Sequence, residues 1–168
     1  LPTTLGSLSG LRLLNVSRNQ LTTLPTNIRG LKALVEINGG RNLLGIIPET
    51  FGELINLEII NFQHNNLRAL PETVGLLTRL QHVDLHNNKL VDLPREMGSW
   101  VLLRQLDVQS NKIKTLPSSC GHCHRLVSLN IGFNQIEMIP HTVSTLTELE
   151  FLNFSSNNLM SLTPGIGK

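Results

Sequence analysis

The 23 residues LQHVDLHNNKLVDLPREMGSWVL, from position 80 to 102, contain the pattern that decides the fold. Apolar Val83 and Leu85 alternate with polar residues, which is typical of a β-strand with one buried face. Pro94 fixes its own φ angle and keeps the residue before it extended, so a long helix at this point is disfavoured. The stretch therefore predicts a short strand whose chain returns through an extended or 3₁₀ segment.

The same pattern recurs along the chain at a constant step of 23 residues. A column of prolines consists of Pro2, Pro25, Pro48, Pro71, Pro94, Pro117 and Pro140. A column of asparagines consists of Asn19, Asn42, Asn65, Asn88, Asn111, Asn134 and Asn157. Aligned on the asparagines, the unit reads LxxLxLxxNxLxxLPxxhxxLxx, where h is apolar. A fixed repeat indicates a solenoid, in which each coil buries its apolar side against the next.

The register predicts one solenoid domain over residues 1–168. We expect a partial coil at 1–7, six full coils at 8–145 and a last incomplete coil at 146–168. Both ends would expose the apolar interior of a coil, whereas solenoids need polar caps, so we expect a fragment of a longer array. In the last coil Thr163 takes the proline position and Pro164 falls one place late.

The asparagine column and the inward column that contains Gly39 both have a structural interpretation. Backbone groups that point inward where a strand turns away need partners, and a neutral amide offers both a donor and an acceptor. An aspartate there would carry a charge into the core, so the asparagines are expected to be structural. In the second coil Gly39 takes an inward position that a large apolar residue holds elsewhere. We expect the ring of Phe62 to fill that space.

The repeat resembles the leucine-rich repeat family over nearly the whole chain. The resemblance implies an α/β-type solenoid: a right-handed coil with a parallel concave β-sheet and a mostly extended or 3₁₀ convex side. The 23-residue period and the LPxxh ending are most similar to the intracellular Ras-group repeats, including those of the Scribble and Erbin scaffolds. That similarity implies a protein–protein interaction module of the scaffold or adaptor type, with a role in signalling.

Composition excludes several other classes of protein. A chain with 40% hydrophobic and 15% charged residues is globular rather than disordered. The net charge is only +2, and the basic residues are scattered rather than gathered in the stripe that nucleic acids require. No apolar run approaches the roughly 20 residues of a membrane-spanning helix. We expect no nucleic acid and no membrane insertion. The two cysteines form no cysteine-rich cap, which favours a reducing, cytoplasmic compartment.

The segment Cys120-Gly121-His122-Cys123-His124 is similar both to a haem attachment site and to a disulfide-exchange motif. Its register favours another interpretation, because Cys120 and Cys123 fall in columns that hold apolar residues in the other coils. Buried cysteine behaves as a small apolar residue there. The alternative is zinc binding by the two cysteines with His122 and His124.

The sequence offers little support for a metal site or a catalytic site elsewhere. Along one strand His82, Asp84 and His86 share a face, but alternate residues lie about 6.6–7 Å apart, too far for ordinary chelation without a neighbour. We therefore expect no metal and no cofactor. Because the sequence contains no catalytic motif such as HExxH or GxSxG, we expect no catalytic residues and no enzyme.

Function is expected on the concave face, where strand residues point away from the core. The central column is Asn15, Asn38, Asn61, Asp84, Asp107, Asn130 and Asn153. The column before it is Leu13, Glu36, Ile59, His82, Gln105, Ser128 and Phe151. The column after it is Ser17, Gly40, Gln63, His86, Gln109, Gly132 and Ser155.

A preformed polar sheet suits a protein partner. We expect the partner to contact the middle coils through His64, His82, Asp84, His86, Gln105, Asp107, Gln109 and Ile59. The alternatives are a ligand-recognition domain of a receptor or immune sensor, and targeting or regulatory repeats of a larger enzyme or structural assembly.

Overall fold

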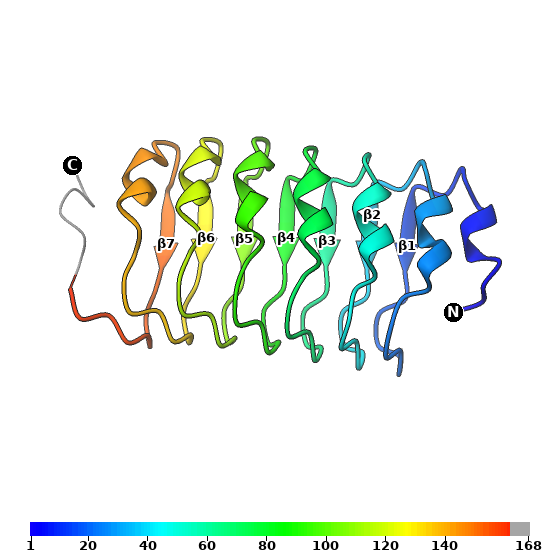
Figure 1. The fold of residues 1–168 in the computed structure, drawn as a ribbon, viewed down its shortest axis with the longest axis horizontal. Coiled ribbons are helices and arrows are strands. Elements are labelled where there is room, and N and C mark those ends of the chain that lie inside the picture. The colour runs from blue at the N-terminus through cyan, green and yellow to red at the C-terminus, as the bar shows by residue number, and fades with distance from the viewer. Residues whose placement is uncertain (162–168) are drawn as a thin grey trace.

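A computed structural model describes residues 1–161 of the 168-residue chain. It contains one parallel sheet of seven short strands, arranged in the order of the sequence (Figure 1). The strands are β1 (Leu13–Asn15), β2 (Glu36–Asn38), β3 (Ile59–Asn61), β4 (His82–Asp84), β5 (Gln105–Asp107), β6 (Ser128–Asn130) and β7 (Phe151–Asn153). The 3₁₀ helices are η1 (Leu5–Ser7), η2 (Thr26–Gly30), η3 (Glu49–Glu53), η4 (Glu72–Leu76), η5 (Arg95–Ser99), η6 (Ser118–His122) and η7 (His141–Thr145).

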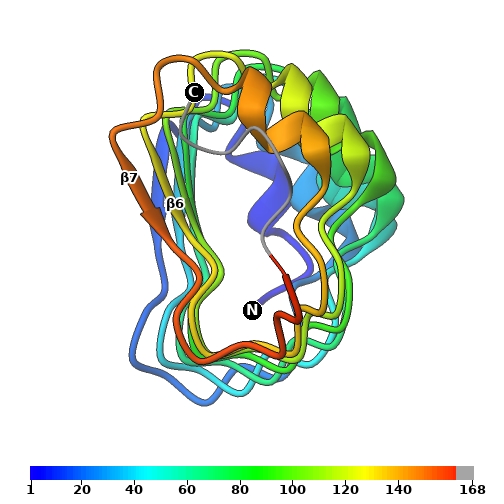
Figure 2. The ribbon, with the colours of Figure 1, turned by 90° about the vertical axis from the view of Figure 1, so that its left-hand side faces the viewer.

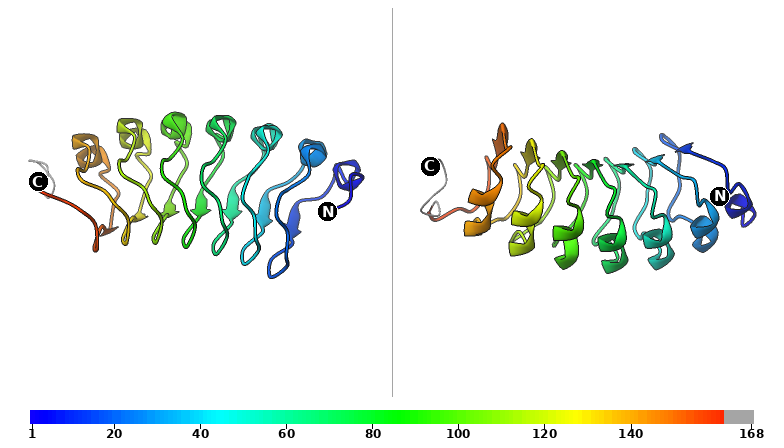
Figure 3. Two further views of the ribbon diagram at one scale, coloured as in Figure 1. Left: turned by 60° about the horizontal axis from the view of Figure 1, so that its bottom comes forward. Right: turned by 90° about the horizontal axis from the view of Figure 1, so that it is seen from above.

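The coils stack in a strict register. Each strand residue pairs with the residue 23 positions later, as Leu13 pairs with Glu36 and Asp84 with Asp107. Viewed along the stack, the strands form one wall and the 3₁₀ helices the opposite wall (Figure 2). Viewed from above, the sheet lines the inside of the curve and the helices lie outside it (Figure 3). The expected solenoid with a parallel concave sheet and a 3₁₀ convex side is confirmed.

The prolines explain why the convex side is 3₁₀ rather than α-helical. Pro48, Pro71 and Pro140, among others, occupy the position before each five-residue helix with an extended backbone, for example φ −68° and ψ 149° at Pro48. Each helix closes within two turns, when the N–H of the next apolar residue donates to a carbonyl three residues back. Within residues 1–161, no helix has the length and apolar composition needed to span a bilayer.

The core is one continuous column of apolar side chains between the two walls. Trp100 is its largest fully buried side chain, and its Nε1–H donates to the carbonyl of Val74 at 3.1 Å. Phe62 fills the space beside Gly39 as expected: a Cβ on Gly39 would lie 3.0 Å from two carbons of the ring. The ring also packs against Phe51, with 5.7 Å between the ring centroids. Residues 162–168, which include Thr163 and Pro164, lie outside the described residues.

The asparagine column connects each coil to the one before it. Asn88 is 8% exposed, and its Nδ2 donates to the carbonyls of Leu85 at 3.0 Å and Phe62 at 2.9 Å. Its Oδ1 accepts the N–H of Leu67 at 3.0 Å. The same arrangement recurs at Asn42, Asn65, Asn111, Asn134 and Asn157. One side chain therefore satisfies backbone groups of two consecutive coils.

Replacing Asn88 by aspartate is expected to lower the free energy of unfolding by about 3 kcal/mol. A carboxylate there has no N–H to donate and brings a charge against two carbonyl oxygens. Urea unfolding followed by circular dichroism measures the loss. Asn87→Asp is the matched control, because Asn87 is exposed and differs from its neighbour in burial rather than in chemistry. Equal losses in the two variants would contradict the assigned role of Asn88.

A left-handed residue precedes each asparagine of this column, which the sequence pattern did not predict. The seven residues have φ between 53° and 57°, and none is glycine. They are Arg18, Arg41, His64, Asn87, Ser110, Phe133 and Ser156. This conformation costs most residues about 1–2 kcal/mol, although asparagine tolerates it. The turn that ends each strand is therefore strained. The buried apolar core and the asparagine hydrogen bonds offset that strain.

Ser110→Gly is expected to raise the free energy of unfolding by about 0.5–1 kcal/mol, because glycine adopts positive φ without a steric penalty. Asn87→Gly is expected to change it by less than about 0.5 kcal/mol, since asparagine already tolerates this region. Thermal and urea unfolding of both variants measure the difference. A destabilised Ser110→Gly protein would show that the left-handed turn is not the source of strain.

Candidate protein-binding surface

The three concave columns lie on the sheet and at the ends of its strands. The first and central columns belong to the strands, whereas the third column begins beyond the strand ends. In six of the seven coils, the side-chain oxygen of the central residue accepts the N–H two residues later, for example Gln109 N to Asp107 Oδ1 at 2.9 Å. In these six coils the central side chain is therefore fixed at the C-terminal end of its strand. The exception is Asn61, whose Oδ1 is buried without a hydrogen-bond partner.

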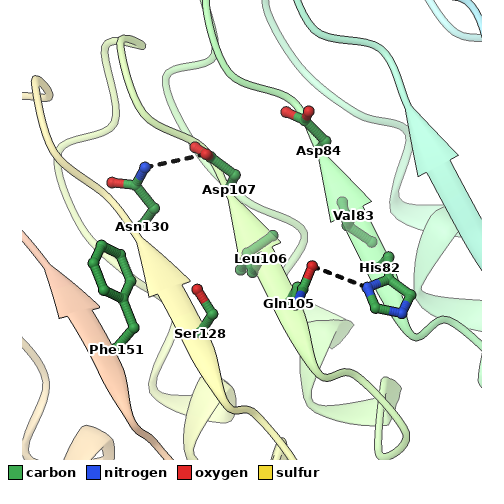
Figure 4. A pocket seen from close by; sticks show the side chains of 9 residues that line it. All are labelled: His82, Val83, Asp84, Gln105, Leu106, Asp107, Ser128, Asn130 and Phe151. Carbon is green, nitrogen blue, oxygen red and sulfur yellow. Dashed lines mark hydrogen bonds between the residues drawn. The ribbon is translucent and has the colours of Figure 1, made fainter.

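A hollow of about 250 Å³ opens on this face across β4 to β7. The polar residues that line it are His82, Asp84, Gln105, Asp107, Ser128 and Asn130, and Phe151 forms its far end (Figure 4). His82 Nδ1 lies 3.1 Å from Gln105 Oε1, so these two side chains order each other. Phe151 is 50% exposed. The hollow therefore combines acceptors and donors with one accessible aromatic ring.

Two histidines that follow β3 and β4 lie near Asp84. Asp84 Oδ1 lies 2.7 Å from His86 Nδ1 and also accepts the backbone N–H of His86 at 3.1 Å. The ring of His86 meets the ring of His64 edge to face, with 4.9 Å between their centroids. Burial lowers the pKa of His64, and the positive charge of Arg41 lowers it further. His64 is therefore held toward its neutral form beside His86.

A chain of side-chain hydrogen bonds reaches Asp107 from the other direction. Asn153 Nδ2 donates to Asn130 Oδ1 at 3.0 Å, and Asn130 Nδ2 donates to Asp107 Oδ2 at 3.1 Å. Asn130 also donates to Gln109 Oε1 at 2.7 Å. This series of hydrogen bonds therefore ends at the carboxylate of Asp107, which can accept hydrogen bonds but cannot donate one.

The residues expected from the sequence separate into three groups. His82, Asp84, Gln105 and Asp107 line the hollow. His64, His86 and Gln109 lie just beyond the strand ends and support the two aspartates.

Ile59 is half-buried on β3, outside the hollow, so it offers less apolar area than Phe151. Phe151 was expected, with Ile59, as an exposed apolar anchor, whereas Ser128 and Asn130 were not among the expected contact residues, although the column register had placed them on the same face.

One cluster on this face has the composition of a cation site. Atoms of Asp84, His86 and Asp107 that could serve as ligands all lie within 4.8 Å of one another. The sequence places His82 on the same strand face as Asp84 and His86, but the side chain of His82 contacts Gln105 instead. The neighbour needed for a close cluster is Asp107, from the next strand.

The cysteine segment is part of the core. Cys120 is 2% exposed and Cys123 is fully buried, and both are free thiols. Cys123 Sγ–H donates to the carbonyl of Met97 at 3.4 Å. Burial raises the pKa of Cys123 to about 12 and also raises the pKa of Cys120. Neither thiol has the exposure or the lowered pKa of a reactive cysteine.

Alkylation by iodoacetamide is therefore expected to be at least about 100-fold slower for the folded protein than in guanidinium chloride, because the thiolate is both inaccessible and scarce. Mass spectrometry of timed samples gives the rate for each cysteine. A cysteine introduced by Ser144→Cys, on the exposed surface of η7, is the matched control and should react rapidly. Native rates similar to that control would contradict the buried assignment.

Comparison with known proteins identifies the family. A leucine rich repeat family model matches residues 35–90, 78–136 and 101–159, and a second leucine rich repeat model matches residues 10–31. The chain belongs to the leucine-rich repeat family. Proteins with these repeats are generally protein-binding modules, and the fold is typically a non-enzymatic scaffold. The search of curated proteins gave no match.

Several solved leucine-rich repeat structures are similar over almost the whole chain. A leucine-rich repeat protein from Leptospira interrogans is 31% identical over 99% of this chain and 42% of its own, with a TM-score of 0.93. The ectodomain of the plant membrane receptor kinase GASSHO1/SCHENGEN3 from Arabidopsis thaliana was solved in complex with Casparian strip integrity factor 2. It is 30% identical over 97% of this chain and 20% of its own, with a TM-score of 0.87.

The PEPR1–AtPEP1 structure is 32% identical over 95% of this chain and 23% of the other, with a TM-score of 0.87. The chain thus spans less than half the length of each of these three structures.

Proposed function

We propose that this chain is a protein-binding module that holds a partner on its concave face, as part of a scaffold or adaptor and without catalytic activity of its own. The observation that carries the proposal is the preformed hollow across β4 to β7, in which ordered polar groups adjoin the exposed ring of Phe151. Interfaces commonly place an aromatic anchor among polar contacts. Stable interfaces bury about 800 Å² on each partner, which needs several coils rather than one.

The setting we propose is intracellular and related to signalling, in the manner of the Ras-group repeats. The 23-residue LPxxh unit supports this, as do two buried thiols with no disulfide among residues 1–161. Free cysteines are common in reducing compartments. The array would then serve as one segment of a larger protein.

A second candidate is a ligand-recognition domain of a receptor. The similarity to the GASSHO1/SCHENGEN3 ectodomain, at a TM-score of 0.87, favours this candidate. Both candidates place the partner on the same concave face. The full-length sequence separates them, because the receptor candidate requires a secretory leader and a membrane anchor.

Blocking the hollow is the direct test of the concave surface. Binders are first selected from a random peptide library displayed on phage, and their affinities for variants of the protein are then compared. Ser128→Tyr places a large ring inside the hollow and is expected to weaken binding at least about ten-fold by steric exclusion. Ser118→Tyr, on the exposed convex surface of η6, is the matched control and should leave affinity unchanged.

The melting temperatures of both variants confirm that they remain folded. Binders that are lost with Ser118→Tyr, and retained with Ser128→Tyr, would place the binding surface on the convex side and contradict the proposal.

A further inference from the structure

We propose that the hollow is selective for a basic side chain: an arginine or lysine of the partner is held between Asp84 and Asp107, while an apolar side chain of the same segment packs on Phe151. This inference rests on the proposed function and specifies the chemistry of the partner.

The charge of the three concave columns is opposite to that of the whole chain. The chain carries a net charge of +2, but its three concave columns contain Glu36, Asp84 and Asp107 and neither lysine nor arginine. Asp84 and Asp107 are directly paired across β4 and β5. Like charges at paired positions repel each other, so a cation between them is favourable.

The hydrogen bonds around the two carboxylates leave acceptors without donors. Asp107 is the last acceptor in the series of hydrogen bonds from Asn153 through Asn130. Because a carboxylate has no proton to donate, Asp107 cannot form a hydrogen bond to the carboxylate of Asp84. Asp84 uses Oδ1 for both contacts to His86, while its Oδ2 accepts no hydrogen bond from residues 1–161.

In the central column, side-chain hydrogen bonds run from Asn153 through Asn130 to Asp107, and among residues 1–161 no such bond continues from Asp107 to Asp84, where two carboxylates meet. A guanidinium group offers five N–H donors in a fixed fork, and an ammonium group offers three. Either one supplies the donors that are missing between Asp107 and Asp84 and neutralises the paired carboxylates.

The shape of the site favours a side chain over a metal ion. The hollow measures about 250 Å³ and extends from the aspartates to the ring of Phe151, well beyond the size of one ion. Figure 4 shows the two aspartates at one end and Phe151 at the other. His86 Nδ1 already contacts Asp84 Oδ1 at 2.7 Å, the shortest polar contact of the cluster.

The register predicts the spacing of the two groups in the partner. Asp107 and Phe151 are two strands apart and two positions apart along the strand, which corresponds to about 12 Å. An extended chain advances about 3.3 Å per residue. A segment that crosses the strands should therefore carry its basic and its large apolar residue three or four positions apart.

The test is a selection of random displayed peptides on the immobilised protein, carried out with a metal chelator present. Peptides selected on the parent should be enriched in arginine or lysine three or four positions from a large apolar residue. Replacing that arginine by neutral citrulline should weaken binding at least about ten-fold, and so should the double variant Asp84→Asn, Asp107→Asn. Asparagine occupies the same column in five other coils, so the double variant is expected to fold.

The matched control is the double variant Asp92→Asn, Glu137→Gln, which changes the net charge equally at two exposed positions away from the sheet. It should leave affinity and preference unchanged. Peptides that bind the hollow without a basic preference would overturn this inference and leave the proposed function intact, whereas failure to select any peptide for the concave face would overturn both. In a parallel selection without the chelator, binding that requires added Zn²⁺ and is lost with His86→Gln would also overturn it, because the site would then be a metal site.

Discussion

The stack depends on the buried amide that joins each coil to the coil before it. Burying apolar columns requires the chain to turn sharply at the end of every strand, and that turn leaves carbonyls and an N–H pointing inward. Asn88 shows the solution, since it donates to carbonyls of two coils and accepts from the N–H of Leu67. The side-chain amide offers two donors and an acceptor without a charge. Hydrophobic burial drives the fold, and this column determines the register in which it occurs.

The periodic features of the structure could be read from the sequence because their causes are periodic. The step of 23 residues predicted the parallel sheet, the pairing of Asp84 with Asp107 and the burial of both cysteines. The filling of the space at Gly39 by Phe62 also followed, since it involves neighbours in one column. These inferences needed only the identity of the column and the knowledge of which columns face inward.

The features that escaped the sequence depend on side-chain conformation and on backbone detail. The residue types of Ser110 and Phe133 do not indicate a positive φ angle, because the turn around them imposes this conformation. Nor does the sequence show that His82 contacts Gln105, or that Asp107 closes the cluster around Asp84. The extent of the hollow depends on side-chain directions in four strands, so Phe151 was placed on the correct face without being recognised as its end wall.

The reach of the hollow has a consequence for how the protein unfolds. Among the described elements, each strand lies beside only the adjacent strands, and each 3₁₀ helix lies beside only the adjacent helices. In such an array, distant coils influence each other only through the coils between them, so partial opening of one segment is inexpensive. A ligand that spans β4 to β7 touches four coils simultaneously. Occupancy would therefore couple coils that are otherwise independent, and the bound region would open as one cooperative block.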